Sequence, residues 1–103
     1  ENSRPSWFGF LITCREGIDR NQIVQMIEAK GVQTRMLFAG NLTKHPCFDQ
    51  MRATGKGYRI AGTLENTDRI MKDTFWIGVY PGMTDEMLEA MANAIKDAVN
   101  GVK

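Results

Sequence analysis

The sequence predicts an α/β fold, an α+β two-layer sandwich in the order β-α-β-loop-α-β-α. Two observations predict it. Three segments are rich in aromatic and β-branched residues, as strands are, and two other segments repeat apolar residues at helical spacing. The length of 103 residues suits one compact domain with one core, so residues 1–103 are expected to form a single domain. A ferredoxin-like split β-α-β arrangement, with helices on one face of the sheet, is the closest simple architecture.

The first part of the chain is predicted to hold a strand, a helix and a second strand. Residues 7–14 (WFGFLITC) have strand composition and end at a turn. Asp19 then provides a helix cap, and Gln22 is placed to complete a capping box. Gly31 suits the left-handed position that ends a helix. Residues 32–38 (VQTRMLF) alternate in the way that a strand requires.

The second part begins with a long irregular stretch, residues 39–63, of a length that is usually functional or mobile. Within it, residues 46–51 are predicted to form a helical turn. A short helix is expected over 66–72 and a third strand over 74–80 (TFWIGVY). The final helix is predicted to be capped by Thr84, to end at Gly101 and to carry an apolar stripe of Leu88, Met91, Ile95 and Ala98.

The first and third strands do not alternate apolar and polar residues, although a sheet with one solvated face should. One set of residues is expected to pack under the helices: Phe8, Phe10, Ile12, Cys14, Phe75, Ile77 and Val79. The opposite face carries large aromatics beside glycines: Trp7, Gly9, Leu11, Trp76, Gly78 and Tyr80. This pattern favours a partner surface, supplied by another domain or a second subunit. A few half-exposed aromatics, or coverage by the long loop, are the alternatives.

The composition is that of an ordinary globular protein, with a formal net charge of +1. It predicts neither a nucleic-acid partner nor a membrane partner, because there is no basic surface and no apolar run approaches the roughly 20 residues of a bilayer span. The two cysteines, Cys14 and Cys47, lack a CxxC spacing and are interpreted as free thiols of a cytoplasmic protein, with a disulfide as the alternative. The opening, residues 1–5, is polar and has no Met, which suggests either a cut at a domain boundary or a processed tag.

No self-contained active site is visible. His45 is the single histidine, and the chain shows no metal-ligand spacing. Residues 55–57 (GKG) lack the strand–loop–helix context of a phosphate-binding loop. Arg35 and Arg69 stand out because they flank the long loop, where two guanidinium groups can clamp a phosphate or carboxylate. Solvated arginines or structural ion pairs remain the alternative interpretation.

The runs at residues 31–43 (GVQTRMLFAGNLT), 66–71 (NTDRIM) and 74–82 (TFWIGVYPG) together resemble the C-terminal end of the DegT-type nucleotide-sugar aminotransferases. These enzymes depend on pyridoxal phosphate (PLP) or pyridoxamine phosphate (PMP). The most similar branch is that of the CDP-4-keto-6-deoxy-D-glucose 3-dehydrases, which serve dideoxysugar synthesis for lipopolysaccharide O-antigen. Residues 5–10 (PSWFGF) also resemble this branch, so the resemblance covers nearly the whole chain.

The resemblance implies a type I aminotransferase fold, in which this chain is the small C-terminal domain behind a large cofactor-binding domain. It implies a nucleotide-diphosphate sugar as substrate, a homodimer, and in the dehydrase branch PMP, an iron–sulfur cluster and a reductase partner. PMP forms an imine with the 4-keto group, and the 3-hydroxyl is eliminated while the cofactor acts as electron sink. The family's catalytic residues and cluster cysteines lie upstream. This chain is therefore expected to contain no catalytic residue and no metal ligand, to bind no cofactor and to be inactive alone.

For substrate binding, the resemblance carries over to five residues. The segment containing Phe38, Asn41 and Thr43 is implied to line the sugar pocket, with Arg35 supporting the loop or reaching the substrate. Arg69 is implied to contact an anion or the substrate. Aminotransferase relatives often have Tyr near Phe38 and His near Thr43, and the difference here suits dehydration better than transamination. A PLP-dependent nucleotide-sugar aminotransferase is the alternative within the family, and a stand-alone ferredoxin-like binding or regulatory module is the alternative outside it.

Overall fold

The computed structural model describes residues 2–102. The elements follow the predicted order and are β1 (Gly9–Thr13), α1 (Arg20–Glu28), β2 (Thr34–Met36), the 3-10 helices η1 (Leu42–Lys44) and η2 (Pro46–Phe48), α2 (Asp49–Thr54), α3 (Glu65–Asp73), β3 (Thr74–Gly78) and α4 (Asp85–Gly101). The structure combines helices with a small antiparallel sheet, in agreement with the predicted class. All three strands are shorter than predicted, and Trp7 and Phe8 lie before the start of β1.

The three strands form one sheet in the order β1-β3-β2, and β3 is antiparallel to both neighbours. β1 and β2 therefore run parallel to each other with β3 between them, which is the predicted split β-α-β arrangement. The register places Leu11 opposite Trp76, and Phe10 opposite Ile77. Because successive side chains of a strand point to opposite faces, Leu11 and Trp76 share one face of the sheet, whereas Phe75 and Ile77 share the other.

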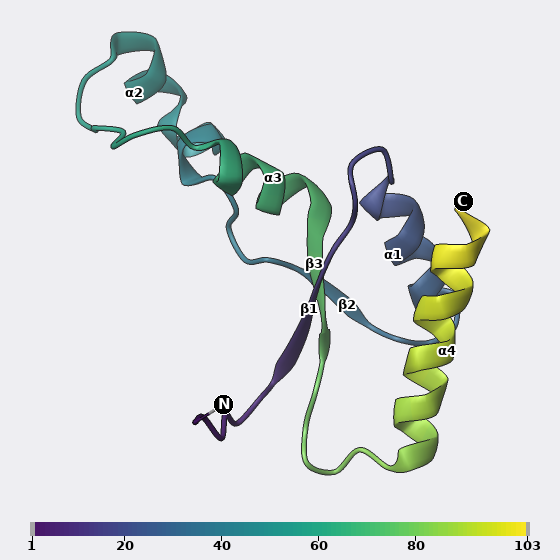
Figure 1. Cartoon of the computed structure of the whole chain (residues 1–103). Coiled ribbons are helices and arrows are strands. Elements are labelled where there is room, and N and C mark those ends of the chain that lie inside the picture. The colour runs from purple at the N-terminus through teal and green to yellow at the C-terminus, as the bar shows by residue number, and fades with distance from the viewer. Residues whose placement is uncertain (1, 103) are drawn as a thin grey trace.

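Local capping fixes where the two main helices begin. The Asp19 carboxylate accepts a hydrogen bond of 2.8 Å from the Asn21 N–H at the start of α1, which satisfies one of the free donors of the first turn. Gly31 follows α1 with a φ of +82°, as predicted. The Thr84 hydroxyl accepts from the Met87 N–H at 3.3 Å and caps α4. Both predicted caps are therefore confirmed, and α1 and α4 lie side by side (Figure 1).

The core lies between the sheet and these two helices. Phe75 and Ile27 are fully buried at its centre, and Ile77 is 4% exposed. The core cluster of buried residues consists of Cys14, Ile23, Val24, Ile27, Phe75, Ile77 and Ala98. The prediction that Phe75 and Ile77 face the helices is thus confirmed.

The same prediction is wrong for Phe8 and Phe10, which are 65% and 60% exposed. Ile12 packs against the core cluster and Cys14 is part of it, so the helices cover the end of β1 rather than its beginning. Leu88 was expected on the buried stripe of α4 and is 46% exposed, because the contacts of α4 with the core begin further along the helix, at Met91.

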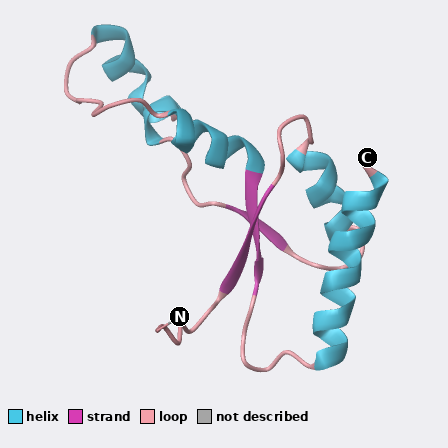
Figure 2. Ribbon diagram, viewed as in Figure 1, coloured by secondary structure: helices cyan, strands magenta, loops and turns pink. Residues whose placement is uncertain are grey.

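The segment between β2 and β3 projects from the body as an arm, defined here as η1, η2, α2, α3 and the residues that join them (Figures 1 and 2). The helical turn predicted over residues 46–51 is confirmed by η2 and α2. Every residue from 51 to 63 is exposed. The radius of gyration is 17.2 Å, whereas a compact domain of this length has about 13 Å. The arm therefore extends well beyond the sheet and its two helices.

Candidate functional site

The loop that leaves β2 turns sharply at Phe38. The Phe38 N–H donates to the Met36 carbonyl at 2.7 Å, and Phe38 has a φ of +45°. A left-handed backbone costs a residue with a β-carbon about 1–2 kcal/mol, so this turn is held by other contacts. It leaves the Phe38 side chain 74% exposed, with its ring centroid 6.3 Å from that of Trp76.

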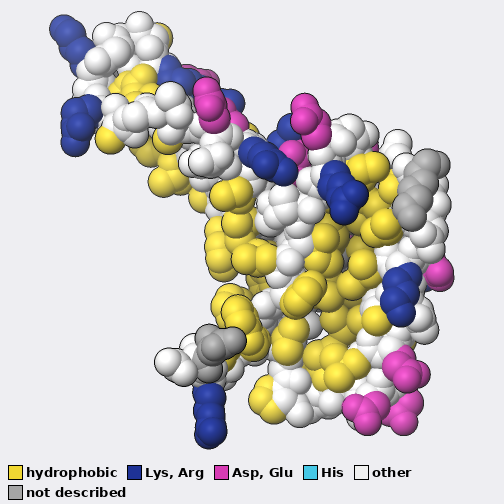
Figure 3. Space-filling view, viewed as in Figure 1, with side chains coloured by type: hydrophobic (Ala, Val, Ile, Leu, Met, Phe, Trp, Pro, Cys, Tyr) yellow, Lys and Arg dark blue, Asp and Glu magenta, His cyan; other side chains and the backbone are white. Residues whose placement is uncertain are grey.

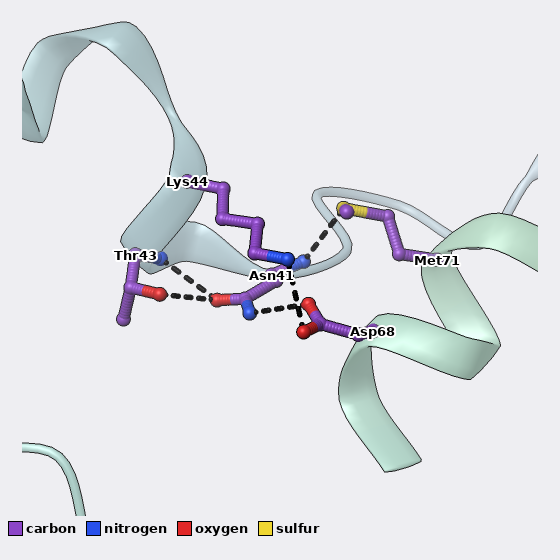
Figure 4. Close-up of polar contacts among 5 residues, drawn as sticks. All are labelled: Asn41, Thr43, Lys44, Asp68 and Met71. Atoms are coloured by element: carbon purple, nitrogen blue, oxygen red, sulfur yellow. Dashed lines mark hydrogen bonds and ion pairs between the residues drawn. The ribbon is translucent and has the colours of Figure 1, made fainter. Parts of the chain in front are cut away.

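Asn41 organises the loop after the turn (Figure 4). Its side-chain oxygen accepts from the Thr43 N–H at 3.0 Å and from the Thr43 hydroxyl at 2.6 Å. Its amide donates to Asp68 Oδ1 at 2.7 Å, and its backbone N–H donates to Met71 Sδ at 3.3 Å. Asn41 is only 2% exposed. Two residues that the resemblance assigned to the sugar pocket, Asn41 and Thr43, are thus bonded to each other, and Asn41 also binds α3.

Asp68 on α3 is the acceptor that sequence reasoning did not single out. Its second carboxylate oxygen pairs with Lys44 Nζ at 2.9 Å. The hydrogen bond from Asn41 and then the one from Lys44 hold the pKa of Asp68 below its ordinary value, so this carboxylate is ionised at neutral pH. The sequence offers little indication of this role. Asp68 stands next to Arg69 in the NTDRIM run, and no nearby residue connects it to the loop.

His45 and Arg52 brace the far end of the same loop. His45 Nε2 lies 2.6 Å from the Ala39 carbonyl oxygen, an arrangement in which this nitrogen donates. The Arg52 guanidinium donates to the carbonyls of Thr43 and His45 and pairs with Asp49. His45 therefore has a structural contact, which agrees with the expectation that it is a loop residue rather than a catalytic one.

The two candidate arginines differ in their surroundings. Arg35 lies on β2 opposite Trp76 in the register, and its guanidinium donates to the Thr34 carbonyl at 2.8 Å and to Gln33 Oε1 at 3.5 Å. Arg69 is exposed on α3, and no hydrogen bond or ion pair joins its guanidinium to another described residue. Among residues 2–102 no contact joins the two arginines, so the structure does not bring them together as a clamp.

The sheet face opposite the helices is apolar and open. We call this face, with the residues that flank it, the outer face. Trp7 and Leu11 are 68% and 57% exposed, and Trp76 is half-buried. Tyr80, which was predicted on the same face, lies beside α4 instead, since its hydroxyl donates to Met87 Sδ at 3.9 Å. A groove of ≈ 320 Å³ runs beside it and is lined by Pro5, Ser6, Trp7, Phe8, Gly9, Leu11, Leu37, Phe38 and Trp76. Figure 3 shows hydrophobic side chains between the N-terminal segment and the base of the arm, and a second gathering toward α4, on the side of the core. The prediction that part of this face is open to solvent in the chain alone is confirmed for Trp7 and Leu11.

The Phe8 ring packs edge-on against Trp76, at 5.2 Å between centroids. Trp76 also covers Gly9, where an added β-carbon would lie 2.7 Å from Trp76 Cε3. The glycine at position 9 thus has a local cause, since it makes room for the indole ring, whereas the exposure of Trp7 and Leu11 has none within the chain.

A site for a phosphate-bearing cofactor is not offered by the N-termini of α1, α3 and α4. Such a site usually uses the free N–H groups of a helix N-terminus, but here carboxylates already lie there: Asp19 at α1, Glu65 and Asp68 at α3, and Asp85 and Glu86 at α4. Within residues 2–102 no group of three His, Cys, Asp or Glu side chains is placed to hold a metal ion. None of the helices in that range combines the length and apolar composition of a bilayer-crossing segment.

Comparison with known proteins gives the chain a family context. Residues 1–96 match the sequence profile of the DegT/DnrJ/EryC1/StrS aminotransferase family, a range that includes the whole loop and α3. Over 100 residues the chain is 45% identical to the dTDP-4-dehydro-2,6-dideoxy-D-glucose 3-dehydratase of Saccharopolyspora spinosa. This alignment covers 95% of this chain and 21% of that protein. Over 99 residues it is 46% identical to the lipopolysaccharide biosynthesis protein RfbH of Salmonella typhimurium, at 94% and 22% coverage. The chain spans about a fifth of the length of these curated relatives.

Proposed function

The chain belongs to the DegT/DnrJ/EryC1/StrS aminotransferase family, and from this premise we propose that it is the C-terminal domain of a nucleotide-sugar 3-dehydrase. The proposed substrate is a CDP-linked 4-keto-6-deoxyglucose, and the proposed setting is cytoplasmic synthesis of dideoxysugars for lipopolysaccharide. The observation that carries the proposal is the similarity of about 45% along nearly the whole chain to one protein named a sugar 3-dehydratase and another named for lipopolysaccharide biosynthesis.

The proposed role of this domain is to cover the sugar pocket. Phe38 presents an exposed ring at the turn after β2, where an aromatic side chain excludes water from a sugar. Arg69 has an uncommitted guanidinium, which suits a phosphate or other anion. Arg35 supports the start of the loop. The hydrogen bonds between Asn41 and Thr43 give this part of the pocket wall its shape.

Enzymes of this family depend on PLP or PMP. Because carboxylates lie at the N-termini of α1, α3 and α4, we assign cofactor binding to the remainder of the parent chain. The proposal extends to a homodimer and, as in the dehydrase branch, to a reductase partner and an iron–sulfur cluster, whose ligands we assign to the remainder of the parent chain. The domain alone is proposed to be inactive.

The outer face supports the proposal that the chain is one domain of a longer protein. Leaving Trp7 and Leu11 largely exposed forgoes about 25 cal/mol for each Å² of apolar surface. A domain that functions alone gains solubility from polar residues on such a face. We propose that the remainder of the parent chain covers it.

The test uses the parent enzyme, purified with its cofactor and a reducing system. Incubation with CDP-4-keto-6-deoxyglucose, and separately with its dTDP counterpart, is followed by NMR of the sugar. Loss of the 3-hydroxyl is the expected result. Formation of a 4-amino sugar with an amino donor, and no loss of the 3-hydroxyl, would establish the aminotransferase alternative. No reaction of either kind would favour a binding module.

The contribution of this domain is tested by Phe38→Ala in the parent enzyme. We expect the KM for the nucleotide sugar to rise about tenfold, because a buried aromatic contact contributes on the order of 1–2 kcal/mol to binding. Phe10→Ala is the matched control, since Phe10 is also an exposed aromatic but lies on the opposite face of the sheet. Equal effects of the two substitutions on KM would contradict the proposed place of Phe38 in the sugar pocket.

A further inference from the structure

The loop after β2 has a backbone conformation that its sequence does not favour. Phe38 has a φ of +45°, and Gly40, two residues later, has a φ of +62°. A bulky residue such as Phe rarely adopts the left-handed region, and such a conformation persists only when surrounding contacts hold it. The source of those contacts decides what controls the position of Phe38.

Besides the contacts of Phe38 with Met36 and Trp76 and of His45 with Ala39, the loop is held from one side of α3 (Figure 4). Asp68 Oδ1 accepts from the Asn41 amide at 2.7 Å, and Asp68 Oδ2 pairs with Lys44 Nζ at 2.9 Å. Met71 Sδ accepts from the Asn41 backbone N–H at 3.3 Å. Residues three apart on a helix share a side, so Asp68 and Met71 hold the loop together.

Gly40 allows the loop to come this close to the helix. A β-carbon at Gly40 would lie 2.6 Å from Met71 Cγ, so both packing and the positive φ require glycine at this position. Asn41, the next residue, is 2% exposed, and both the oxygen and the nitrogen of its side chain are bonded. The contact between the loop and α3 is therefore closely packed rather than a loose surface association.

We infer that Asp68 is a positioning residue, which together with Asn41 and Lys44 forms a latch that holds the loop on α3 and so fixes where Phe38 stands. The inference rests on the proposed function only in giving Phe38 a place in the sugar pocket. In this inference, the Asp68 carboxylate holds the pocket wall in place without contacting the substrate itself.

The hydrogen bond to Asn41 is the principal part of the latch. The side chains of Lys44 and Asp68 are 54% and 38% exposed. An ion pair with this much solvent exposure contributes little to stability. In contrast, removing the acceptor of a buried amide leaves that amide without a partner, which is costly. Asp68→Asn still offers an oxygen to Asn41, whereas Asp68→Leu offers none. The two variants should therefore differ, although both remove the charge.

The first test is hydrogen–deuterium exchange of the parent protein, without substrate, measured by mass spectrometry on a peptide covering residues 39–45. Asp68→Leu is expected to accelerate exchange in this peptide about tenfold or more, as loss of a hydrogen bond to a charged group does for local opening. Asp68→Asn is expected to change it less than about threefold. Asn66→Leu, which places the same leucine at an exposed position of the same helix, is the matched control and should have no effect.

A peptide covering β1 reports on the fold in the same experiment. Unchanged exchange of the loop in Asp68→Leu, or equal acceleration in the loop and in β1, would overturn the inference. Should Asp68→Leu fail to fold, Asn41→Ala removes the same hydrogen bond from the loop side. It must then reproduce the selective acceleration, and its failure to do so would equally overturn the inference.

The second test is kinetic and uses the parent enzyme with its nucleotide sugar. Asp68→Leu is expected to raise KM about tenfold and to leave kcat within about threefold, the pattern of lost substrate positioning. Asp68→Asn is expected to restore most of the loss. A fall in kcat with an unchanged KM would contradict a positioning role. A parent protein that does not act on nucleotide sugars would refute the proposed function while the exchange result stands, whereas unselective exchange in an active enzyme would refute the latch alone.

Discussion

Replacing Leu11 with Glu tests whether the outer face is a docking surface or a solvated surface. Leu11 lies in the middle of β1 opposite Trp76 and is 57% exposed. About half of the 1.5–3 kcal/mol that full burial of a leucine contributes is therefore at stake in the chain alone, and Leu11→Glu should cost it about 1 kcal/mol. In the parent protein the same carboxylate would lie against the covering layer, where burying an unpaired charge costs about 3 kcal/mol or more.

The assay is urea denaturation of the isolated chain, followed by far-UV circular dichroism, and of the parent protein, followed by circular dichroism and limited proteolysis. Leu88→Glu is the matched control, because Leu88 is 46% exposed and lies on α4, away from the outer face. It should cost about 1 kcal/mol or less in both proteins. Equal losses for Leu11→Glu in the chain and in the parent would refute the docking argument. A loss of several kcal/mol in the chain alone would show that the face is part of its own core.

Three further predictions follow from single sites. Gly40→Ala should destabilise the chain by about 1–3 kcal/mol more than Gly17→Ala in urea denaturation, because both glycines have positive φ but only Gly40 faces a close neighbour; equal costs would contradict the packing at Gly40. The pKa of Asp68 is lowered from 3.8 in the folded chain, so its contribution to stability is complete above that pH and is lost as the pH falls through the lower, folded value. Because a protonated Asp68, like Asn, still offers an oxygen to Asn41, exchange protection of the loop should decline by less than about threefold below pH 3.8 in the wild type and show no such step in Asp68→Asn. Burial raises the pKa of the Cys14 thiol, while Cys47 is exposed; a thiol reagent should therefore modify Cys47 first and Cys14 only on unfolding, and rapid reaction of both would contradict this burial.

Local signals in the sequence predicted most of the fold. Asp19, Gly31 and Thr84 act within a turn or two of their own positions, so their effects can be read from neighbouring residues. Phe75 and Ile77 were predicted correctly because β3 lies in the middle of the sheet, where both neighbours and the helices constrain it.

The failures concern features that depend on distant parts of the chain. Phe10 has the same strand pattern as Phe75, but its burial depends on how far α1 and α4 extend over β1, which no local signal encodes. Similarly, Asn41 and Asp68 are 27 residues apart, so the hydrogen bond that organises the candidate site was invisible in the sequence. The resemblance identified the loop that carries Phe38, Asn41 and Thr43, but the roles it suggested for these residues remain proposals.

The arm has a fixed attachment to the body, and this attachment explains why the loop can be ordered although it projects. The Arg20 guanidinium at the start of α1 donates to the Met71 carbonyl at 2.6 Å and to the Thr74 carbonyl at 3.4 Å. It thereby satisfies a carbonyl of the last turn of α3, which lacks a partner within its own helix. The same Met71 holds Asn41 through its sulfur. Arg20 thus fixes the end of α3 relative to the core, α3 fixes the loop, and the loop fixes Phe38. Two contacts between residues that lie far apart in the sequence, Arg20 with Met71 and Asn41 with α3, thus place the loop that carries the exposed aromatic ring. Such an arrangement is of use when the ring must meet a surface that this chain does not supply, which is what the open outer face beside it also indicates.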